Sequence, residues 1–266
     1  MVQYANSDSS RRNENSDVKK QLLILLVRFA AIVFKKSSYQ IISKIGVRNM
    51  IANANGINIY YEKSGSGEPL ILLHGNGQSH RVFNAAIKEL CKSHTVYALD
   101  SRGHGKSTKV KKLNYMDMAN DVAEFIENTI GKKVFVYGLS DGGIIGLLLA
   151  IHYPQLLSSV IVSGVNTTPD GLKPQKIILY KILKPLFPAK MELLLTQPSI
   201  TKEQLKSIKI PIVVLAGEKD IIKKSHTQFI AENIPNSNLK ILEGEGHTSY
   251  VKNNTKIAEI IEPYII

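Results

Sequence analysis

The hydrophobic pattern of this chain alternates between short, largely apolar runs and longer amphipathic stretches. Short continuous apolar runs are typical of strands that are buried on both faces of a parallel sheet. They occur at Leu70–Leu73, Val134–Tyr137, Val160–Ser163 and Ile212–Gly217, and Leu239–Leu242, which Lys240 interrupts, reads as the last strand. Between them lie helical patterns, the clearest of which places Tyr115, Met118, Ala119, Val122, Ile126 and Ile130 on one face. The pattern therefore predicts an α/β fold with a mostly parallel central sheet and helices on both faces.

Length and composition are consistent with one such domain. At 266 residues and 44% apolar content, the chain can bury one full core. It shows no internal repeat and no metal-ligand cluster, so neither a metal nor a cofactor is expected. The single cysteine, Cys91, excludes an intramolecular disulfide and allows a reducing compartment.

One motif stands between a predicted strand and a predicted helix. Gly138-Leu139-Ser140-Asp141-Gly142 directly follows the run Val134–Tyr137 and precedes the apolar stretch Ile144–Ile151. A Gly-x-Ser-x-Gly in this position is the nucleophile-elbow pattern, in which a sharp turn raises the serine hydroxyl above the sheet. The five residues alone are a weak signal, because glycine and serine are common. Their position makes Ser140 the candidate nucleophile.

A nucleophilic serine needs a base, and the base needs an acid that fixes its tautomer. In enzymes with this elbow, the acid and then the base follow the serine along the chain, each after a late strand. Asp220 follows the run Ile212–Gly217, and His247 follows the last predicted strand. Each has an ordinary alternative, since Asp220 could be a helix cap or a solvated loop charge and His247 a histidine without a special task. Glu218 and Asp170 are the alternative acids.

The oxyanion hole of such a site takes one N–H from the residue after the nucleophile, here Asp141, and another from a loop after an early strand. His74-Gly75-Asn76-Gly77 follows the run Leu70–Leu73, so the Asn76 N–H is the second candidate donor. The alternative is that these glycines only form a turn.

From about Ile57 to the C-terminus, the chain resembles the α/β-hydrolase superfamily. Besides the elbow, the resemblance rests on Tyr60-Tyr61-Glu62, the Gly-x-Gly-x-Pro at 65–69 and the block Asp100–Ser107. It implies the α/β-hydrolase fold in residues 49–266, with a short helical cap at about 165–209 between the sixth and seventh strands. Gly105-Lys106-Ser107 is similar to the end of a phosphate-binding loop, but Ser101 stands where that loop needs glycine. Nucleotide binding is therefore not expected.

A serine nucleophile favours acyl chemistry on an ester, thioester, amide or lactone, with the carboxylic ester first. A short cap suggests a small or medium substrate. Apolar residues at 177–183 and 186–187 could line an acyl pocket or form the core of the cap. Ser140-Asp141-Gly142-Gly143 also resembles the elbow of hydrolases that act on amino-acid esters, where Asp141 would attract a substrate ammonium. Alternatively, Asp141 only stabilises the N-terminus of the following helix. A small-molecule receptor and an acyltransferase remain alternative functions.

Residues 1–48 form a separate extension. Residues 1–17 are polar, and the apolar stretch Leu22–Phe34 has Lys19, Lys20, Lys35 and Lys36 on its flanks. Thirteen residues are too few to span a bilayer, which needs about 20. Residues 19–36 could instead contact a membrane surface, pack on the domain or a second copy, or act as an atypical signal anchor. We therefore expect a cytoplasmic or membrane-associated protein. The formal charge is +12, but the sequence contains no nucleic-acid recognition motif, so nucleic acid is not an expected partner.

Overall fold

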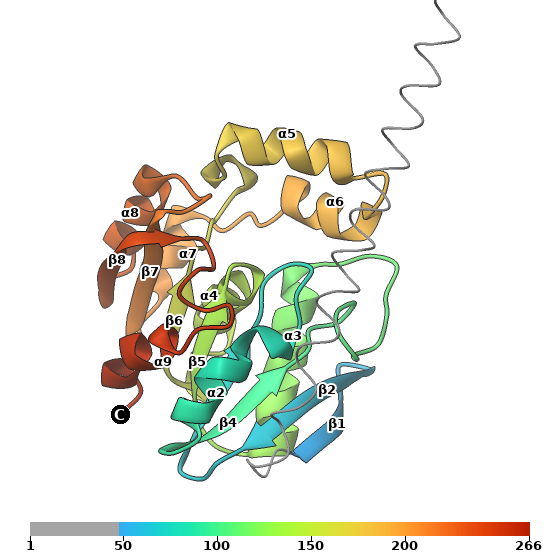
Figure 1. The fold of residues 1–266 in the computed structure, drawn as a ribbon, viewed down its shortest axis with the longest axis vertical. Coiled ribbons are helices and arrows are strands. Elements are labelled where there is room, and N and C mark those ends of the chain that lie inside the picture. Colours follow the sequence, from blue (N-terminus) through green and yellow to red (C-terminus); the bar gives the residue numbers. More distant parts are fainter. Residues whose placement is uncertain (1–47) are drawn as a thin grey trace, which may run out of the picture. The chain divides into compact units, whose positions relative to one another are not determined.

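The computed structural model describes residues 48–266. The predictions for the N-terminal extension, including a membrane contact through residues 19–36, therefore lie outside the described residues. The domain is built on one eight-stranded sheet with the strand order β1-β2-β4-β3-β5-β6-β7-β8 (Figure 1). The strands are β1 (Arg48–Ala54), β2 (Ile57–Ser64), β3 (Glu68–Leu73), β4 (His94–Leu99), β5 (Val134–Leu139), β6 (Leu157–Ser163), β7 (Ile212–Lys219) and β8 (Ser237–Gly246).

The sheet is parallel except at one edge. β1 pairs with β2 and β2 with β4 in antiparallel fashion, whereas every neighbouring pair from β4 to β8 is parallel. Parallel strands end at the same edge of a sheet, so the loops after β3, β5, β6, β7 and β8 converge. The predicted mostly parallel sheet is confirmed, and it brings the candidate residues to one edge.

Helices connect the strands and cover both faces. They are α2 (Asn84–Leu90), α3 (Tyr115–Phe125), α4 (Asp141–His152), α5 (Pro174–Leu183), α6 (Pro188–Thr196), α7 (Lys202–Ser207), α8 (Lys224–Asn233) and α9 (Lys256–Ile261). The helix that the pattern predicts from Tyr115 begins there, because the side chain of Asn114 accepts a hydrogen bond from the Met116 N–H at 2.7 Å. It continues beyond Phe125 as a single π-helical turn, Ile126–Ile130.

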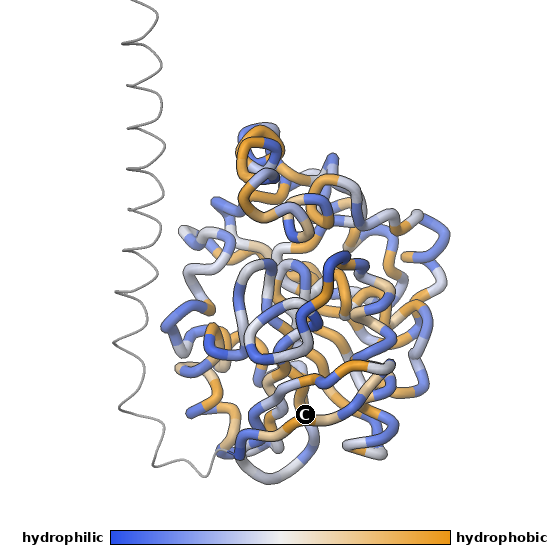
Figure 2. Tube along the Cα trace, turned by 90° about the vertical axis from the view of Figure 1, so that its right-hand side faces the viewer, coloured by the Kyte–Doolittle hydropathy of each residue, from blue (hydrophilic) through white to orange (hydrophobic). Residues whose placement is uncertain are grey.

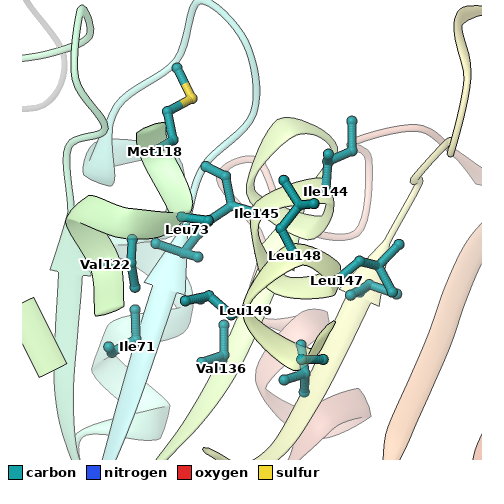
Figure 3. Close-up of a cluster of buried hydrophobic side chains, with 14 of the residues drawn as sticks. Ile71, Leu73, Met118, Val122, Val136, Ile144, Ile145, Leu147, Leu148 and Leu149 are labelled. Atoms are coloured by element: carbon teal, nitrogen blue, oxygen red, sulfur yellow. The ribbon is translucent and has the colours of Figure 1, made fainter. Parts of the chain in front are cut away.

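Two hydrophobic clusters lie on opposite faces of the sheet. Because successive strand residues point to opposite faces, Val136 and Val162 belong to one cluster and Tyr137 and Ile161 to the other. The first cluster packs under α3, α4 and α8, and the second under α2 and α9. Figure 3 shows the first cluster, where the side chains of α4 meet those of β3, β5 and α3. This packing fixes α4 and therefore the residue at its start.

Three helices, α5, α6 and α7, separate β6 from β7 and form the cap that the resemblance implies (Figure 1). The apolar residues at 177–187 do not all do what the sequence suggested. Five of them expose between 40% and 67% of their surface, namely Ile178, Leu179, Ile182, Leu186 and Phe187. A place in the core of the cap is therefore wrong for these five side chains. None of the helices in residues 48–266 is long and apolar enough to cross a membrane.

Candidate active site

Ser140 stands in a strained turn at the junction of β5 and α4. Its backbone has φ 55° and ψ −115°, a conformation that L-residues rarely adopt. The turn is held because the Ser140 N–H donates to the Ser163 carbonyl at 2.7 Å. A side chain at Gly142 would begin 2.1 Å from the Leu73 carbonyl oxygen, so only glycine lets α4 start this close to β3. These features are those of the elbow that the motif predicts.

The structure brings Ser140, His247 and Asp220 together. His247 Nε2 lies 3.1 Å from Ser140 Oγ, and His247 Nδ1 lies 2.7 Å from Asp220 Oδ1. Ser140 follows β5, Asp220 follows β7 and His247 follows β8, so the three side chains meet at the carboxyl edge of the sheet. The arrangement suits a base that removes the serine proton while an acid orients its other nitrogen.

Neither alternative acid lies in this position. Glu218 is exposed and accepts a hydrogen bond from the Gly244 N–H at 2.8 Å. Asp170 is exposed, and within residues 48–266 the structure shows no contact between it and His247. Asp220, by contrast, is 3% exposed and also accepts from the Ile222 N–H at 3.0 Å.

The charge state of Asp220 follows from two opposing effects. Burial alone would raise its pKa, because a carboxylate loses hydration. The hydrogen bond from His247, its charge and backbone hydrogen bonds at Ile222 and Gly217 together outweigh burial, and the pKa of Asp220 is lowered. Asp220 is therefore ionised at neutral pH and can stabilise a positive charge on His247.

The two candidate oxyanion donors are neighbours. A side chain at Gly75 would begin 3.1 Å from Ser140 Cβ, so the loop after β3 lies directly against the nucleophile. In this loop, Asn76 Nδ2 donates to Asp141 Oδ2 at 3.0 Å. Asp141 is the first residue of α4, and the first N–H groups of a helix have no partner within the helix. The side-chain bond thus holds together the two residues whose N–H groups are the candidate donors.

Asp141 is 3% exposed, and each oxygen of its carboxylate accepts a hydrogen bond. Tyr115 Oη donates to Oδ1 at 2.9 Å, and Asn76 donates to Oδ2. Burial raises the pKa of Asp141 to about 6, and the two hydrogen bonds oppose this rise. Sequence reasoning expected a substrate contact or a helix-terminal charge, and it missed Tyr115, because only the tertiary fold brings α3 to the elbow.

Three further residues near the site were not found from the sequence. The Lys190 carbonyl of α6 lies 3.4 Å from Asn76 Nδ2, which brings the cap to the oxyanion loop. Burial lowers the pKa of the Lys190 ammonium. Tyr180 of α5 has its pKa raised by burial and by the charges of Asp141 and Asp220. The third residue is Gly164, which directly follows β6. Of the three, only Gly164 could have been found from the sequence, because it is a glycine at the end of a predicted strand.

No group of three or more His, Cys, Asp or Glu side chains in the described part of the chain could hold a metal ion.

Comparison with known proteins agrees with this geometry. A family model described as the alpha/beta hydrolase fold matches residues 68–184, which include Asn76, Ser140 and Asp141. The serine hydrolase BPHL of Homo sapiens is 25% identical over 246 residues, which cover 79% of this chain and 84% of that protein. Ethanol acetyltransferase 1 of Cyberlindnera jadinii is 35% identical over 97 residues, which cover 36% of this chain and 29% of that protein.

Among solved structures, naproxen esterase (carboxylesterase NP) of Bacillus subtilis has a TM-score of 0.70. It is 18% identical, and the match covers 84% of this chain and 93% of the esterase. At this identity the likeness concerns the fold. Together with the family model and the human relative, it shows that the chain is an enzyme of the serine-hydrolase type that belongs to the α/β-hydrolase superfamily.

Proposed function

We propose that this protein hydrolyses carboxylic esters with small or medium acyl groups, through an acyl-enzyme on Ser140. The observation that carries the proposal is the continuous hydrogen-bonded path from Ser140 Oγ through His247 to Asp220, with distances of 3.1 and 2.7 Å. The strained elbow that presents Ser140 supports it.

The chemistry follows from this path. His247 Nε2 takes the proton of Ser140 as Oγ attacks the carbonyl carbon, and the ionised Asp220 stabilises the resulting imidazolium. The negative charge that develops on the carbonyl oxygen is met by the N–H groups of Asn76 and Asp141. His247 then donates its proton to the leaving alcohol. In the second half, His247 activates a water molecule that hydrolyses the acyl-enzyme and restores Ser140.

Turnover of a short-chain nitrophenyl ester tests the proposal. Repeated turnover supports a hydrolase, whereas a single stoichiometric release of nitrophenol followed by arrest indicates a receptor that uses a hydrolase pocket. Parallel assays with a thioester, an anilide and a lactone rank the acyl classes. The small cap, whose α6 lies beside the oxyanion loop, supports a small or medium substrate.

An acyltransferase is the second candidate, favoured by the 35% identity over 97 residues to an ethanol acetyltransferase. Both functions share the acyl-enzyme and differ in the nucleophile that resolves it. Ethanol added to the nitrophenyl ester assay therefore separates them. Formation of the ethyl ester in excess of the free acid indicates a transferase, and no effect of ethanol on the free acid indicates a hydrolase.

The charge of Asp141 is expected to make the enzyme prefer cationic acyl groups above pH 6. A unit charge within about 8 Å contributes roughly 2 kcal/mol at an effective dielectric constant of about 20, or about 30-fold when the carboxylate is fully ionised. Because the pKa of Asp141 is raised to about 6, the carboxylate is ionised at pH 7 and protonated at pH 5. The preference for a valine ester over the matching 3-methylbutanoate ester should therefore fall about tenfold from pH 7 to pH 5.

The ratio of kcat/KM for the two esters measures this, because the titration of His247 affects both substrates and cancels. Asp141→Asn should make the ratio independent of pH. If the wild-type ratio is already flat, Asp141 acts only through its hydrogen bonds to Asn76 and Tyr115, and the aminoacyl preference is refuted.

Gly164→Ala is expected to impair catalysis through the position of His247. A Cβ at residue 164 would lie 2.8 Å from His247 Nδ1 and 3.2 Å from Asp220 Oδ2. Displacement of a catalytic group by about 1 Å can cost on the order of 100-fold, so kcat on the nitrophenyl ester should fall by about this factor.

Gly131→Ala is the matched control for that variant. Gly131 has φ +72° and Gly164 has φ +61°, so both changes strain the backbone, but a Cβ at residue 131 meets nothing within 4 Å. Thermal melting should report similar destabilisation of both variants. Equal kcat in the two variants would show that Gly164 does not set the position of His247.

We also propose that the protein acts in the cytoplasm or at a membrane that residues 19–36 contact. Five basic residues, Lys19, Lys20, Arg28, Lys35 and Lys36, within and around the apolar stretch Leu22–Phe34 support this. The chain contains no tryptophan, so the fluorescence of a full-length Phe29→Trp variant tests the contact with anionic vesicles.

A further inference from the structure

Helix α5 of the cap carries an apolar surface that nothing in residues 48–266 covers. Within these residues, nine large hydrophobic side chains are exposed, and five of them fall between residues 178 and 187. They are Ile178, Leu179, Ile182, Leu186 and Phe187, and we call this set the α5 patch. A clustered set of this kind marks an interaction surface, whereas scattered exposed apolar residues do not.

Three members of the α5 patch, Ile178, Leu179 and Ile182, lie on one side of the helix. Ile178 and Ile182 are four residues apart and Leu179 and Ile182 three, which places them one turn apart on the same face. Leu186 and Phe187 follow in a turn at the end of the helix, where their N–H groups both donate to the Leu183 carbonyl, at 3.0 and 3.1 Å. Figure 1 shows α5 as the outer helix of the cap, and Figure 2 shows apolar residues along it at the top of the domain.

The charges around the α5 patch are positive. From Leu172 to Met191 the sequence contains Lys173, Lys176, Lys181, Lys184 and Lys190 and no acidic residue. Lys173 donates to the Asp220 carbonyl and Lys184 pairs with Glu192, so Lys176 and Lys181 are the lysines on α5 itself that remain for a partner. An apolar face bordered by lysines is the composition of helices that lie at the surface of anionic membranes.

The position of α5 relative to the catalytic residues gives such a contact a consequence. Lys173, directly before α5, bonds to the carbonyl of the acid Asp220, and its N–H donates to the Ile221 carbonyl at 2.9 Å. The α5 patch therefore lies on a helix whose start is tied to the loop of the active site. A surface that binds the patch is therefore connected through Lys173 to the loop that carries Asp220.

We infer that the α5 patch docks on an anionic lipid bilayer, with Ile178, Ile182 and Leu186 in the interface and Lys176 and Lys181 toward the headgroups. Charge disfavours the other occupants. The apolar stretch of this chain at residues 22–34 is itself flanked by Lys19, Lys20, Lys35 and Lys36. A second copy of the patch would likewise place lysines against lysines. Both contacts are repulsive, whereas an anionic surface attracts.

Tryptophan fluorescence tests this docking in the full-length chain, because the sequence contains no tryptophan and one substitution gives one emitter. Ile182→Trp reports from the patch. Ile51→Trp on β1 is the matched control, since both isoleucines are 67% exposed. With vesicles of phosphatidylcholine and phosphatidylglycerol, Ile182→Trp should shift to shorter wavelength and be quenched by brominated lipid, and Ile51→Trp should do neither. Leu186→Trp serves as a second reporter from the patch.

Two further variants separate the apolar and charged contributions. In the Ile182→Trp background, Lys176→Gln with Lys181→Gln should weaken vesicle binding about 25-fold, because each lysine near an anionic surface contributes about fivefold. Ile178→Gln should weaken it about tenfold or more through lost apolar burial. Vesicles of phosphatidylcholine alone should bind more weakly than the anionic ones.

Three results would overturn the inference. The patch does not bind lipid if neither Ile182→Trp nor Leu186→Trp responds to vesicles, even when the protein cosediments through another segment. Equal responses of Ile182→Trp and Ile51→Trp indicate non-specific adsorption. A blue-shifted, shielded Ile182→Trp without vesicles means that the patch is already covered, by a second copy if the shift depends on protein concentration and by this chain if it does not. None of these readouts requires ester turnover, so they are independent of the proposed function.

Discussion

Replacing Ser140 with alanine is expected to abolish labelling by a fluorophosphonate probe and to reduce kcat on a nitrophenyl ester by about 10⁶-fold. The size follows because the residues of a Ser-His-Asp relay act as a unit, so loss of the nucleophile costs about as much as loss of all three. Ser140 Oγ is the atom that His247 Nε2 contacts at 3.1 Å, and alanine leaves His247 without a proton to remove. Gel-based labelling and initial rates measure the effect.

Ser140→Gly is the informative companion of this variant. The φ of 55° and ψ of −115° at residue 140 store strain of about 1–3 kcal/mol in any L-residue, and glycine relieves it. We therefore expect Ser140→Gly to melt at or above the temperature of Ser140→Ala while being equally inactive. If labelling persists in Ser140→Ala and maps to another serine, the assignment of the site is wrong.

Asp220→Asn is expected to reduce kcat by on the order of 10⁴-fold with little change in fold. Asp220 Oδ1 accepts from His247 Nδ1 at 2.7 Å, which leaves Nε2 free to accept the serine proton. An asparagine amide that donates to Nδ1 would favour the opposite tautomer, in which Nε2 carries a proton and cannot act as base. Steady-state kinetics on the nitrophenyl ester, with thermal melting as a check on folding, measures the loss.

Glu218→Gln and Asp170→Asn are the controls for this prediction. Glu218 lies two residues before Asp220 but is exposed and bonded to the Gly244 N–H, so its loss should change kcat by less than about tenfold. An Asp220→Asn enzyme of normal activity, beside a crippled Glu218→Gln, would move the acid to Glu218.

The central part of the fold could be predicted from sequence because its strands are buried on both faces. Every residue of β5 is buried, so the strand appears as one apolar run. β1 was not predicted, because the first four of its seven residues are exposed and its pattern is weak. The signal that could have found the β1–β2 hairpin is the Asn55-Gly56 pair, a turn sequence whose residues have φ 49° and 73°.

The residues of the candidate site differ in the same way. Ser140, Asp220 and His247 could be placed because each follows a strand, and the carboxyl ends of parallel strands meet. The hydrogen bonds of Asp141 to Tyr115 and Asn76 could not be predicted. Tyr115 and Asn76 lie 26 and 65 positions from Asp141 in the sequence, and their contact with it depends on how the helices pack. The exposure of Ile182 could not be predicted from the sequence either, because an apolar helix pattern does not show whether its apolar face packs against another element.

The position of β8 at an edge of the sheet is expected to make loss of activity a local event. His247 is carried by the end of β8, which within residues 48–266 pairs only with β7, whereas Ser140 is carried by β5 between two partners. Edge elements open at lower free energy than the centre of a domain. Mild heat or denaturant should therefore remove the base while the nucleophile and the main core stay in place. We therefore expect activity to depend on how firmly β8 is held, and to be lost before the fold unfolds and recovered when the stress is removed.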